Sequence, residues 1–410
     1  MACEVEAGPV PGDDPGATGG DRFRVLVTAG YFEPGWRAGG PVRSLAEMLD
    51  AAGPEVEVTL ITRDHDLGDP VPYPGLSGRF VPRGRHRVFY LAPRRLAHWR
   101  TLRRGLRGVR YDLLYVNSVW SPLSILAVVA ARLRLVRAGH LLLTPRGELG
   151  AGALGLKRTR KRLFWAVWRQ ALRGRRTIWH ATTPLEAADI RRALPGARVA
   201  VVAENDGPAP TDPPAGPGPA GPARLVFIGR ISAMKNVDLI LRALALVGGE
   251  VEFDLYGPCE NAGYWERCRN LLTELPANVV AVHRGALPPE RVRGVFARYD
   301  AFVLPTRGEN FGHVIAESLS VACPVICSDR TPWTEVLRGG GGAVLPDLTP
   351  QALAELIDRV AAASPAQRHQ ARLAAAAAYR RWRDHVVDQA SVLDQARAVV
   401  RTVPTVPAAR

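Results

Sequence analysis

The sequence predicts an α/β protein with two Rossmann-like, doubly wound parallel-sheet domains that face each other across a cleft. Short apolar runs alternate with amphipathic stretches of helical period twice along the chain, before and after residues 208–222. Residues 208–222 are almost entirely Pro, Gly and Ala, which is typical of a linker. A chain of 410 residues is also long for one hydrophobic core. A ligand is then expected in the cleft, at the carboxyl ends of the strands.

The first domain is expected at residues 21–207. A helix is predicted to begin at Pro41, because proline suits the first helical position, and a loop with Gly39 and Gly40 precedes it. Apolar runs predict strands at residues 22–28, 56–62, 113–117, 141–144, 177–181 and 198–202. Further helices are predicted at residues 122–137, 156–173 and 184–194.

The second domain is expected at residues 223–377. Its predicted strands are residues 224–228, 251–256, 279–283, 301–304 and 324–328, and its predicted helices are residues 237–246, 289–298 and 313–323. Residues 339–342 predict a turn. In the segment 378–410, an amphipathic helix at about residues 379–400 is expected to pack back toward the first domain. Residues 1–20 are acidic, rich in Gly and Pro and without an apolar stretch, which predicts a disordered tail and not a signal peptide.

The charge balance is strongly basic, with a formal net charge of +15. Only three of the 54 basic residues are lysines, and with the many Ala, Gly and Pro residues this skew is typical of a genome-wide bias. Part of the positive net charge therefore reflects this bias and is not a sign of an anionic partner. No stretch indicates a nucleic-acid module, since no aromatic stacking pattern accompanies the arginines, and nucleic acid is not expected as a partner.

The number and spacing of the cysteines indicate whether the protein works in a reducing or an oxidising compartment. The chain has five cysteines and no C-x-x-C pair, so neither a disulfide framework nor a zinc site is indicated. A reduced, cytoplasmic environment is therefore predicted. The longest apolar run, around residues 125–131, is too short to span a bilayer.

The most informative motif is a pair of glutamates eight residues apart, Glu309 and Glu317. They follow the predicted strand at residues 301–304 and bracket Gly312, near the start of the next predicted helix. Free amide N–H groups and the macrodipole at a helix N-terminus favour an anion such as a diphosphate. Two acids on either side of a diphosphate can hold the hydroxyls of the sugars at its two ends. The motif therefore favours a nucleotide-sugar site.

With its neighbouring motifs, the chain resembles a retaining glycosyltransferase of family 4, of the glycosyl transferases group 1, over about residues 22–395. The motifs that carry the resemblance are Gly39-Gly40, Gly229-Arg230, Lys235, Glu309 with Glu317, and the stretch 324–329. The two glutamates alone would be a weak signal, but their order behind a strand and behind the Gly-Arg…Lys motif is specific. The resemblance implies the GT-B fold.

The resemblance also implies residue roles. Arg230 and Lys235 would neutralise the donor diphosphate, Glu309 would hold hydroxyls of the transferred sugar, and Glu317 would hold the ribose. The remaining implied donor-binding residues, through backbone groups or close approach, are Gly39, Gly40, Gly229, Phe311, Gly312, His313 and Val314. No metal or cofactor is expected.

The implied reaction moves a hexose-type sugar from a nucleoside-diphosphate sugar to a hydroxyl acceptor, with retention of anomeric configuration. The acceptor could be a glycan, a lipid-linked or a small molecule. No carboxylate is placed as a covalent nucleophile, so that step stays unassigned. Two departures from the family pattern stand out: the loop after residues 141–144 offers Arg146 and Glu148 where many members carry a histidine, and the hinge is residues 203–207, Ala-Glu-Asn-Asp-Gly.

Several alternatives stay open. Glu317 could have no role beyond a salt bridge on the helix surface. Asp64-His65-Asp66 matches the metal-binding motif D-x-D, and we expect this match to be due to chance. The basic stretches 85–110 and 156–176, with their tryptophans, fit either packing on the first sheet or contact with an anionic membrane. The chain could also be a sugar-nucleotide epimerase or hydrolase of the same shape, or a basic nucleic-acid-binding protein.

Overall fold

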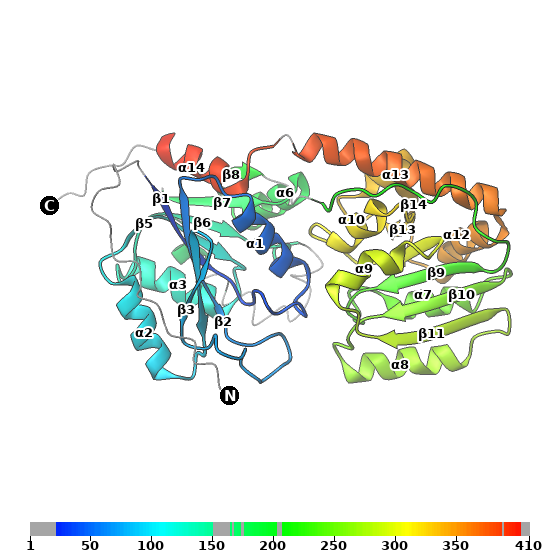
Figure 1. Ribbon diagram of the computed structural model, residues 1–410, viewed down its shortest axis with the longest axis horizontal. Helices are drawn as coiled ribbons and strands as arrows, with labels where there is room; N and C mark the ends of the chain where they lie inside the picture. Colours follow the sequence, from blue (N-terminus) through cyan, green and yellow to red (C-terminus); the bar gives the residue numbers. More distant parts are fainter. Residues whose placement is uncertain are drawn as a thin grey trace, which may run out of the picture.

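The computed structural model describes residues 22–150, 165, 168–173, 176–202, 207–387 and 389–402. The tail expected at residues 1–20, and most of the helix expected at residues 156–173, lie outside the described residues. The chain forms two α/β lobes side by side, each with its own sheet and flanking helices (Figure 1). Among the described residues, no helix combines the length and the apolar character needed to cross a bilayer.

The first lobe contains an eight-stranded sheet with the order β3-β4-β2-β1-β5-β6-β7-β8. Its elements are β1 (Phe23–Thr28), α1 (Gly40–Asp50), β2 (Val56–Arg63), β3 (Phe80–Arg83), β4 (His86–Leu91), α2 (Leu96–Leu106), β5 (Arg110–Asn117), α3 (Pro122–Arg132), β6 (Arg137–Thr144), β7 (Thr177–Ala181), α6 (Pro184–Ala193) and β8 (Val199–Val202). The predicted strands are all present. The sheet is parallel, as expected, except at one edge, where β3 pairs antiparallel with β4. A short hairpin turn, Gly84-Arg85, joins these two strands, and neither strand was predicted.

Both faces of the first sheet are covered. One hydrophobic cluster packs α1 and the C-terminal helix α14 (Val392–Thr402) on one face, through Leu45 and Leu393 among others. A second cluster packs α2, α3 and α6 on the other face, through Leu102, Val128 and Ile190. Doubly covered parallel strands account for the nearly continuous apolar runs in the sequence.

The second lobe contains a six-stranded parallel sheet with the order β11-β10-β9-β12-β13-β14. Its elements are β9 (Ala223–Ile228), α7 (Val237–Leu244), β10 (Val251–Tyr256), α8 (Ala262–Thr273), β11 (Val279–Gly285), α9 (Pro289–Phe296), β12 (Ala301–Leu304), α10 (His313–Ser320), β13 (Val325–Ser328), α11 (Thr334–Val336), a π-helical turn (Leu337–Gly341), β14 (Gly342–Leu345), α12 (Pro350–Ala362) and α13 (Pro365–Val387). The predicted turn at residues 339–342 thus straddles the end of the π-helical turn and the start of β14. Because β9 and β12 are neighbours, the loops that follow them meet at the same edge of the sheet.

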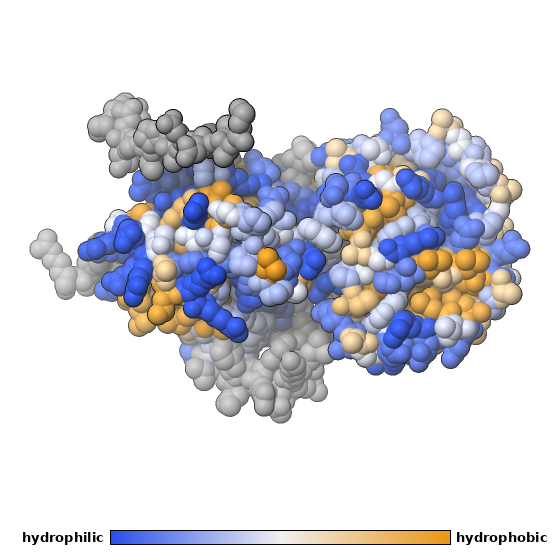
Figure 2. Space-filling view, turned by 60° about the horizontal axis from the view of Figure 1, so that its bottom comes forward, coloured by the Kyte–Doolittle hydropathy of each residue, from blue (hydrophilic) through white to orange (hydrophobic). Residues whose placement is uncertain are grey.

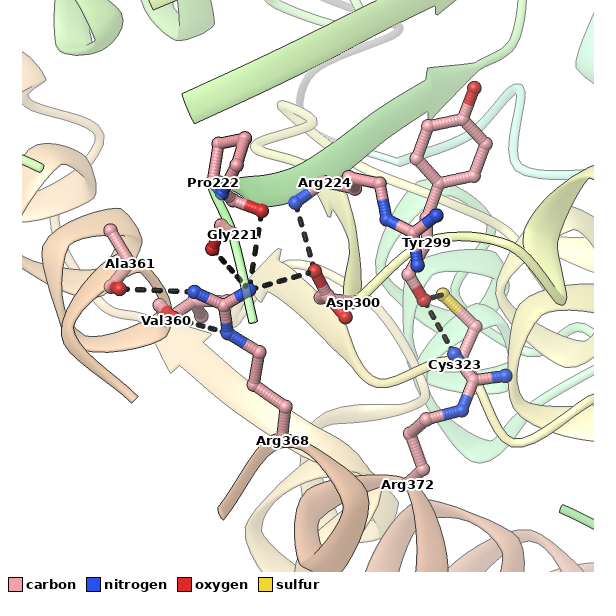
Figure 3. A network of polar contacts seen from close by, with 10 residues as sticks. All are labelled: Gly221, Pro222, Arg224, Tyr299, Asp300, Cys323, Val360, Ala361, Arg368 and Arg372. Carbon is pink, nitrogen blue, oxygen red and sulfur yellow. Dashed lines mark hydrogen bonds and ion pairs between the residues drawn. The ribbon is translucent and has the colours of Figure 1, made fainter. Parts of the chain in front are cut away.

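The predicted single C-terminal helix is wrong in extent, because two helices occupy this region. Helix α13 begins at Pro365 and runs along the second lobe, and α14 lies on the first lobe (Figure 1). Arg368 of α13 donates to the carbonyls of Gly221 and Pro222 at 3.2 Å and pairs with Asp300 at 3.4 Å, and Arg372 donates to the Tyr299 carbonyl at 2.6 Å (Figure 3). Helix α13 therefore ties the end of the linker to the second sheet before the chain returns to the first lobe.

Candidate active site

The candidate site lies where the loops after β9 and β12 meet. Backbone and side-chain bonds hold the two loops together: the Arg307 amide donates to the Met234 carbonyl at 2.8 Å, and Thr306 Oγ1 donates to the same carbonyl at 3.2 Å. This arrangement brings Lys235, from the first loop, to Glu309, from the second, and the two side chains form an ion pair. Both are mostly buried, with exposed fractions of 16% and 11%.

The second glutamate and the glycine between them have the predicted placement on α10. Gly312 is the N-cap of α10 with a φ of 83°, a conformation that favours glycine, and the helix begins at His313. The first amide N–H groups of a helix lack intrahelical partners, so those of His313 and Val314 are available to an anion. Glu309 precedes this helix end, and Glu317 lies one turn inside it.

Glu317 does not form a salt bridge on an exposed helix surface. Its side chain is only 9% exposed and pairs with Arg43 of α1, which belongs to the other domain. Burial raises the pKa of Glu317, and the Arg43 guanidinium opposes that rise. The second acid of the motif therefore faces the interdomain cleft.

The glycine pair at the start of α1 permits the close approach of the two domains. A Cβ atom on Gly40 would lie 2.7 Å from Cδ2 of His313, and Gly39 has a φ of 73°. The His313 ring forms a 2.7 Å hydrogen bond with Ser44 Oγ. Burial, with Arg43 and Arg146 nearby, lowers the pKa of His313 to about 3, so its ring is neutral at physiological pH.

Phe311 has a structural role beside the site. Its buried ring packs against Trp333 and Trp382, with ring centroids 5.5 and 6.0 Å away, and its carbonyl accepts a 2.6 Å bond from Trp333 Nε1. Tyr379 joins this aromatic cluster and donates to the Pro208 carbonyl at 2.7 Å. The cluster thus links the motif loop to the beginning of the linker.

Gly229 and Arg230 follow β9 directly. Gly229 donates its amide to the Tyr256 carbonyl at 3.0 Å, which fixes the start of the loop. The Arg230 side chain is 43% exposed and lies 3.4 Å from the Glu260 carboxylate, at the rim of the site. Arg230 can therefore reorient more freely than Lys235.

Arg146 and Glu148 occupy the first-domain loop after β6, and they differ in orientation. Arg146, with a φ of 52°, donates to Asn117 Oδ1 at 3.0 Å, and its charge acts on His313 across the cleft. Glu148 accepts bonds from Ser118 Oγ and the Val119 amide, both at 2.7 Å. Arg146 thus lies beside the donor loop, whereas Glu148 holds its own domain's loops together.

The D-x-D motif has a structural role in the first domain. Asp66 accepts the backbone amides of Trp36 and Arg37, at 2.9 and 3.1 Å, and Asp64 accepts Ser77 Oγ at 2.5 Å. Within the part of the chain that the structure describes, no group of three His, Cys, Asp or Glu residues is arranged to hold a metal ion.

Residues that the sequence analysis did not assign also cross the cleft. They are Arg43 and Ser44 on α1, and Asn310, whose Nδ2 donates to Thr182 Oγ1 at 2.8 Å. The sequence held one hint of a functional role for Arg43. A positive charge in the first turn of a helix is unfavourable, because it opposes the macrodipole. Violations of such local rules are expected at functional sites.

Comparison with known proteins finds the same two-domain plan. The family model described as "Glycosyl transferase 4-like domain" matches residues 39–205, and the model described as "Glycosyl transferases group 1" matches residues 210–378. The D-inositol 3-phosphate glycosyltransferase of Arthrobacter sp. (strain FB24) is 27% identical over an alignment of 358 positions that covers 79% of this chain and 82% of that protein. The sulfoquinovosyl transferase SQD2 of Arabidopsis thaliana is 28% identical over 128 residues, which are 31% of this chain but only 21% of that protein.

Solved structures agree on the fold. A sucrose-phosphate synthase from Thermosynechococcus elongatus superposes with a TM-score of 0.68 at 21% identity, covering 92% of this chain and all of that one. Anabaena HepE, solved in complex with UDP-glucose, gives a TM-score of 0.63 at 16% identity, covering 93% of this chain and 99% of that one. With one model on each domain and these structural neighbours, the chain belongs to glycosyltransferase family 4, the glycosyl transferases group 1, and has the GT-B fold.

Proposed function

We propose that this glycosyltransferase moves a hexose-type sugar from a nucleoside-diphosphate sugar to a hydroxyl acceptor, with retention of anomeric configuration. The observation that carries the proposal is the buried Lys235–Glu309 pair beside the N-terminus of α10. This arrangement offers a cation and helix amides to a diphosphate, and a carboxylate to the sugar next to it.

In the proposed reaction, negative charge develops on the diphosphate as the glycosidic bond breaks. Lys235, the nearby Arg230 and the first amides of α10 stabilise this charge in a site from which water is largely excluded. Glu309 accepts hydrogen bonds from hydroxyls of the departing sugar, and Glu317 accepts those of the ribose. Because these groups supply the neutralising charge, the proposed reaction needs no metal or other cofactor.

Donor binding is tested by a thermal-shift screen with UDP-, GDP- and dTDP-sugars. A ligand that binds only the folded protein stabilises it by about 2.7 kcal/mol at one hundred times its Kd, which raises Tm by several degrees. One donor class is expected to raise Tm, and the matching free nucleoside diphosphate to do so as well. If none of these compounds shifts Tm, the proposal fails.

A sugar-nucleotide epimerase or hydrolase is the alternative within the same fold. Product analysis with and without acceptor separates the two, because a transferase consumes its donor efficiently only when an acceptor is present. Efficient donor turnover without acceptor would favour the alternative.

We also propose that the first domain contacts an anionic membrane through the surface of α2 and α3, at the cytoplasmic face. Five apolar side chains are exposed there: Leu96, Leu126, Val129, Leu133 and Leu135. Exposed arginines lie on these two helices or within a few residues of their ends: Arg94, Arg95, Arg100, Arg103, Arg104, Arg107, Arg110, Arg132, Arg134 and Arg137. A cavity of about 90 Å³ between these two helices and the sheet is lined by apolar residues and Thr28. Figure 2 shows hydrophobic side chains beside strongly hydrophilic ones on this lobe.

None of the tryptophans described in the basic stretches is fully exposed. Trp168 is buried in the first domain, with its Nε1 donating to the Val119 carbonyl at 3.0 Å, and Trp99 is partly buried. Phe164 lies outside the described residues. The proposed contact therefore depends on the leucines and arginines of α2, α3 and the turn after α3.

The membrane proposal predicts that a Leu133→Glu, Leu135→Glu variant loses vesicle binding. Each exposed leucine contributes apolar burial, and the arginines attract anionic headgroups by about 1 kcal/mol each. Flotation with vesicles that contain phosphatidylglycerol should recover the wild-type protein but not the variant, and high salt should weaken recovery. The control is Leu246→Glu, which changes an exposed leucine of the second domain. Equal recovery of all three proteins would contradict the proposal.

A further inference from the structure

Arg43 occupies an unusual position at the domain interface. It lies in the first turn of α1, three residues after Gly40, where a positive charge is unfavourable for the helix itself. One of its guanidinium nitrogens pairs with Glu317 of the other domain, and another lies 3.3 Å from Glu47 on its own helix. The contact with Glu317 is thus an interdomain one.

Glu317, the partner of Arg43, needs a nearby positive charge to stay ionised. Glu317 is mostly buried, and burial favours the neutral, protonated form of its carboxyl group. A protonated carboxyl group has fewer acceptor sites, whereas a carboxylate can accept both hydroxyls of a ribose. Glu317 can therefore hold a ribose fully only when a nearby charge keeps it ionised.

We propose that Arg43 is a positioning residue for the donor: from the first domain, it keeps the Glu317 carboxylate ionised and oriented toward the ribose of the nucleotide. This inference rests on the proposed function. It means that the ribose site on the second domain is complete only when the first domain closes over it. Closure and donor binding are then coupled through a single ion pair.

Other charges near Glu317 are placed differently. Arg293 of α9 also acts on Glu317, but it donates to Ser320 Oγ at 3.1 Å and to the Ala209 carbonyl at 2.7 Å. Glu47 opposes Arg43 from the same helix, Arg383 of α13 acts on the neighbouring Tyr379, and His313 stays neutral. Among these described groups, Arg43 forms the direct pair with Glu317.

The inference predicts that Arg43→Ala binds the nucleoside diphosphate about 10- to 100-fold more weakly than the wild type near pH 7. Without Arg43, the effect of burial is opposed less, so the pKa of Glu317 is higher than in the wild type. The variant therefore protonates Glu317 at a pH where the wild type still has the carboxylate. The affinity deficit should therefore shrink as the pH rises toward about 9. Titration calorimetry with UDP, GDP and dTDP across pH measures both effects.

Three further variants separate this role from a structural one. Arg43→Lys keeps the charge and should restore most of the affinity. Ser44→Ala removes a neighbouring interdomain hydrogen bond without touching Glu317, and should keep the wild-type pH profile. In a Glu317→Gln background, Arg43→Ala should cost little, because there is no carboxylate left to ionise.

The outcomes are distinguishable from failure of the proposed function. If the wild type binds none of the three nucleotides, the proposed function itself fails, and the inference fails with it. Two results would refute only the role of Arg43, provided that the wild type binds one of the nucleotides. In the first, Arg43→Ala binds that nucleotide as tightly as the wild type. In the second, Arg43→Ala binds it more weakly by the same factor at every pH.

Discussion

Lys235→Ala is expected to lower kcat/KM for sugar transfer by about 10²- to 10³-fold. The lysine is mostly buried beside the N-terminus of α10, where a charge that stabilises a developing anion is worth more than in water. Glu309→Gln should cause a loss of similar size, because an amide accepts the sugar hydroxyls less strongly than a carboxylate. Steady-state assays with the donor identified by thermal shift measure both effects.

A matched control lies on α7, the helix that follows Lys235. Arg242 on α7 forms an exposed pair with Asp238 at 3.1 Å, so Arg242→Ala removes a cation without altering the site. Its activity should stay within about twofold of the wild type. Melting temperatures of all variants show whether a loss reflects unfolding. Folded Lys235→Ala and Glu309→Gln proteins with full activity would contradict the assigned roles.

The second large effect is expected at Gly40. A Cβ at this position would lie 2.7 Å from the His313 ring, so Gly40→Ala must displace this ring or move the two domains apart, and Gly40→Val more so. Misplacement of reacting groups by about 1 Å can cost about 100-fold in rate, and a loss of that order in kcat is expected for Gly40→Val. Because Gly40→Val disturbs the domain contact that pairs Arg43 with Glu317, the affinity for the free nucleoside diphosphate should fall as well as the rate of transfer.

Gly30 provides the control for Gly40. It lies in the same loop before α1, and a Cβ there would have no atom within 4 Å. Gly30→Ala should therefore keep near wild-type kcat, and both proteins should melt at similar temperatures. Equal activity of Gly40→Val and Gly30→Ala would show that close approach at Gly40 is not needed for transfer.

Much of the fold was predictable because its sheets are buried on both faces. Such strands are continuous apolar runs, and proline in the first turn begins helices such as α3, α6 and α9. The hairpin β3–β4 was missed because Pro82 and two arginines, Arg83 and Arg87, interrupt its short strands at the sheet edge. The break between α13 and α14 was missed because apolar periodicity continues through it.

The arrangement of those site residues that belong to a single motif was predictable from the sequence. Glu309, Gly312 and Glu317 belong to one strand–loop–helix unit, so their spacing alone places them around a helix N-terminus. The partners of these residues come from elsewhere in the chain. Glu317 meets Arg43, 274 residues away, and this contact depends on how two separate domains pack, which local patterns do not encode.

The central claim is that Lys235 binds the diphosphate while Glu309 holds the sugar. Calorimetry with the free nucleoside diphosphate, which lacks the sugar, tests it most directly on two variants. We predict that Lys235→Ala weakens binding by about 10- to 100-fold. We predict that Glu309→Gln binds as tightly as the wild type or more tightly, because it frees Lys235 from its partner. Equal losses in the two variants, or a loss only in Glu309→Gln, would contradict the account.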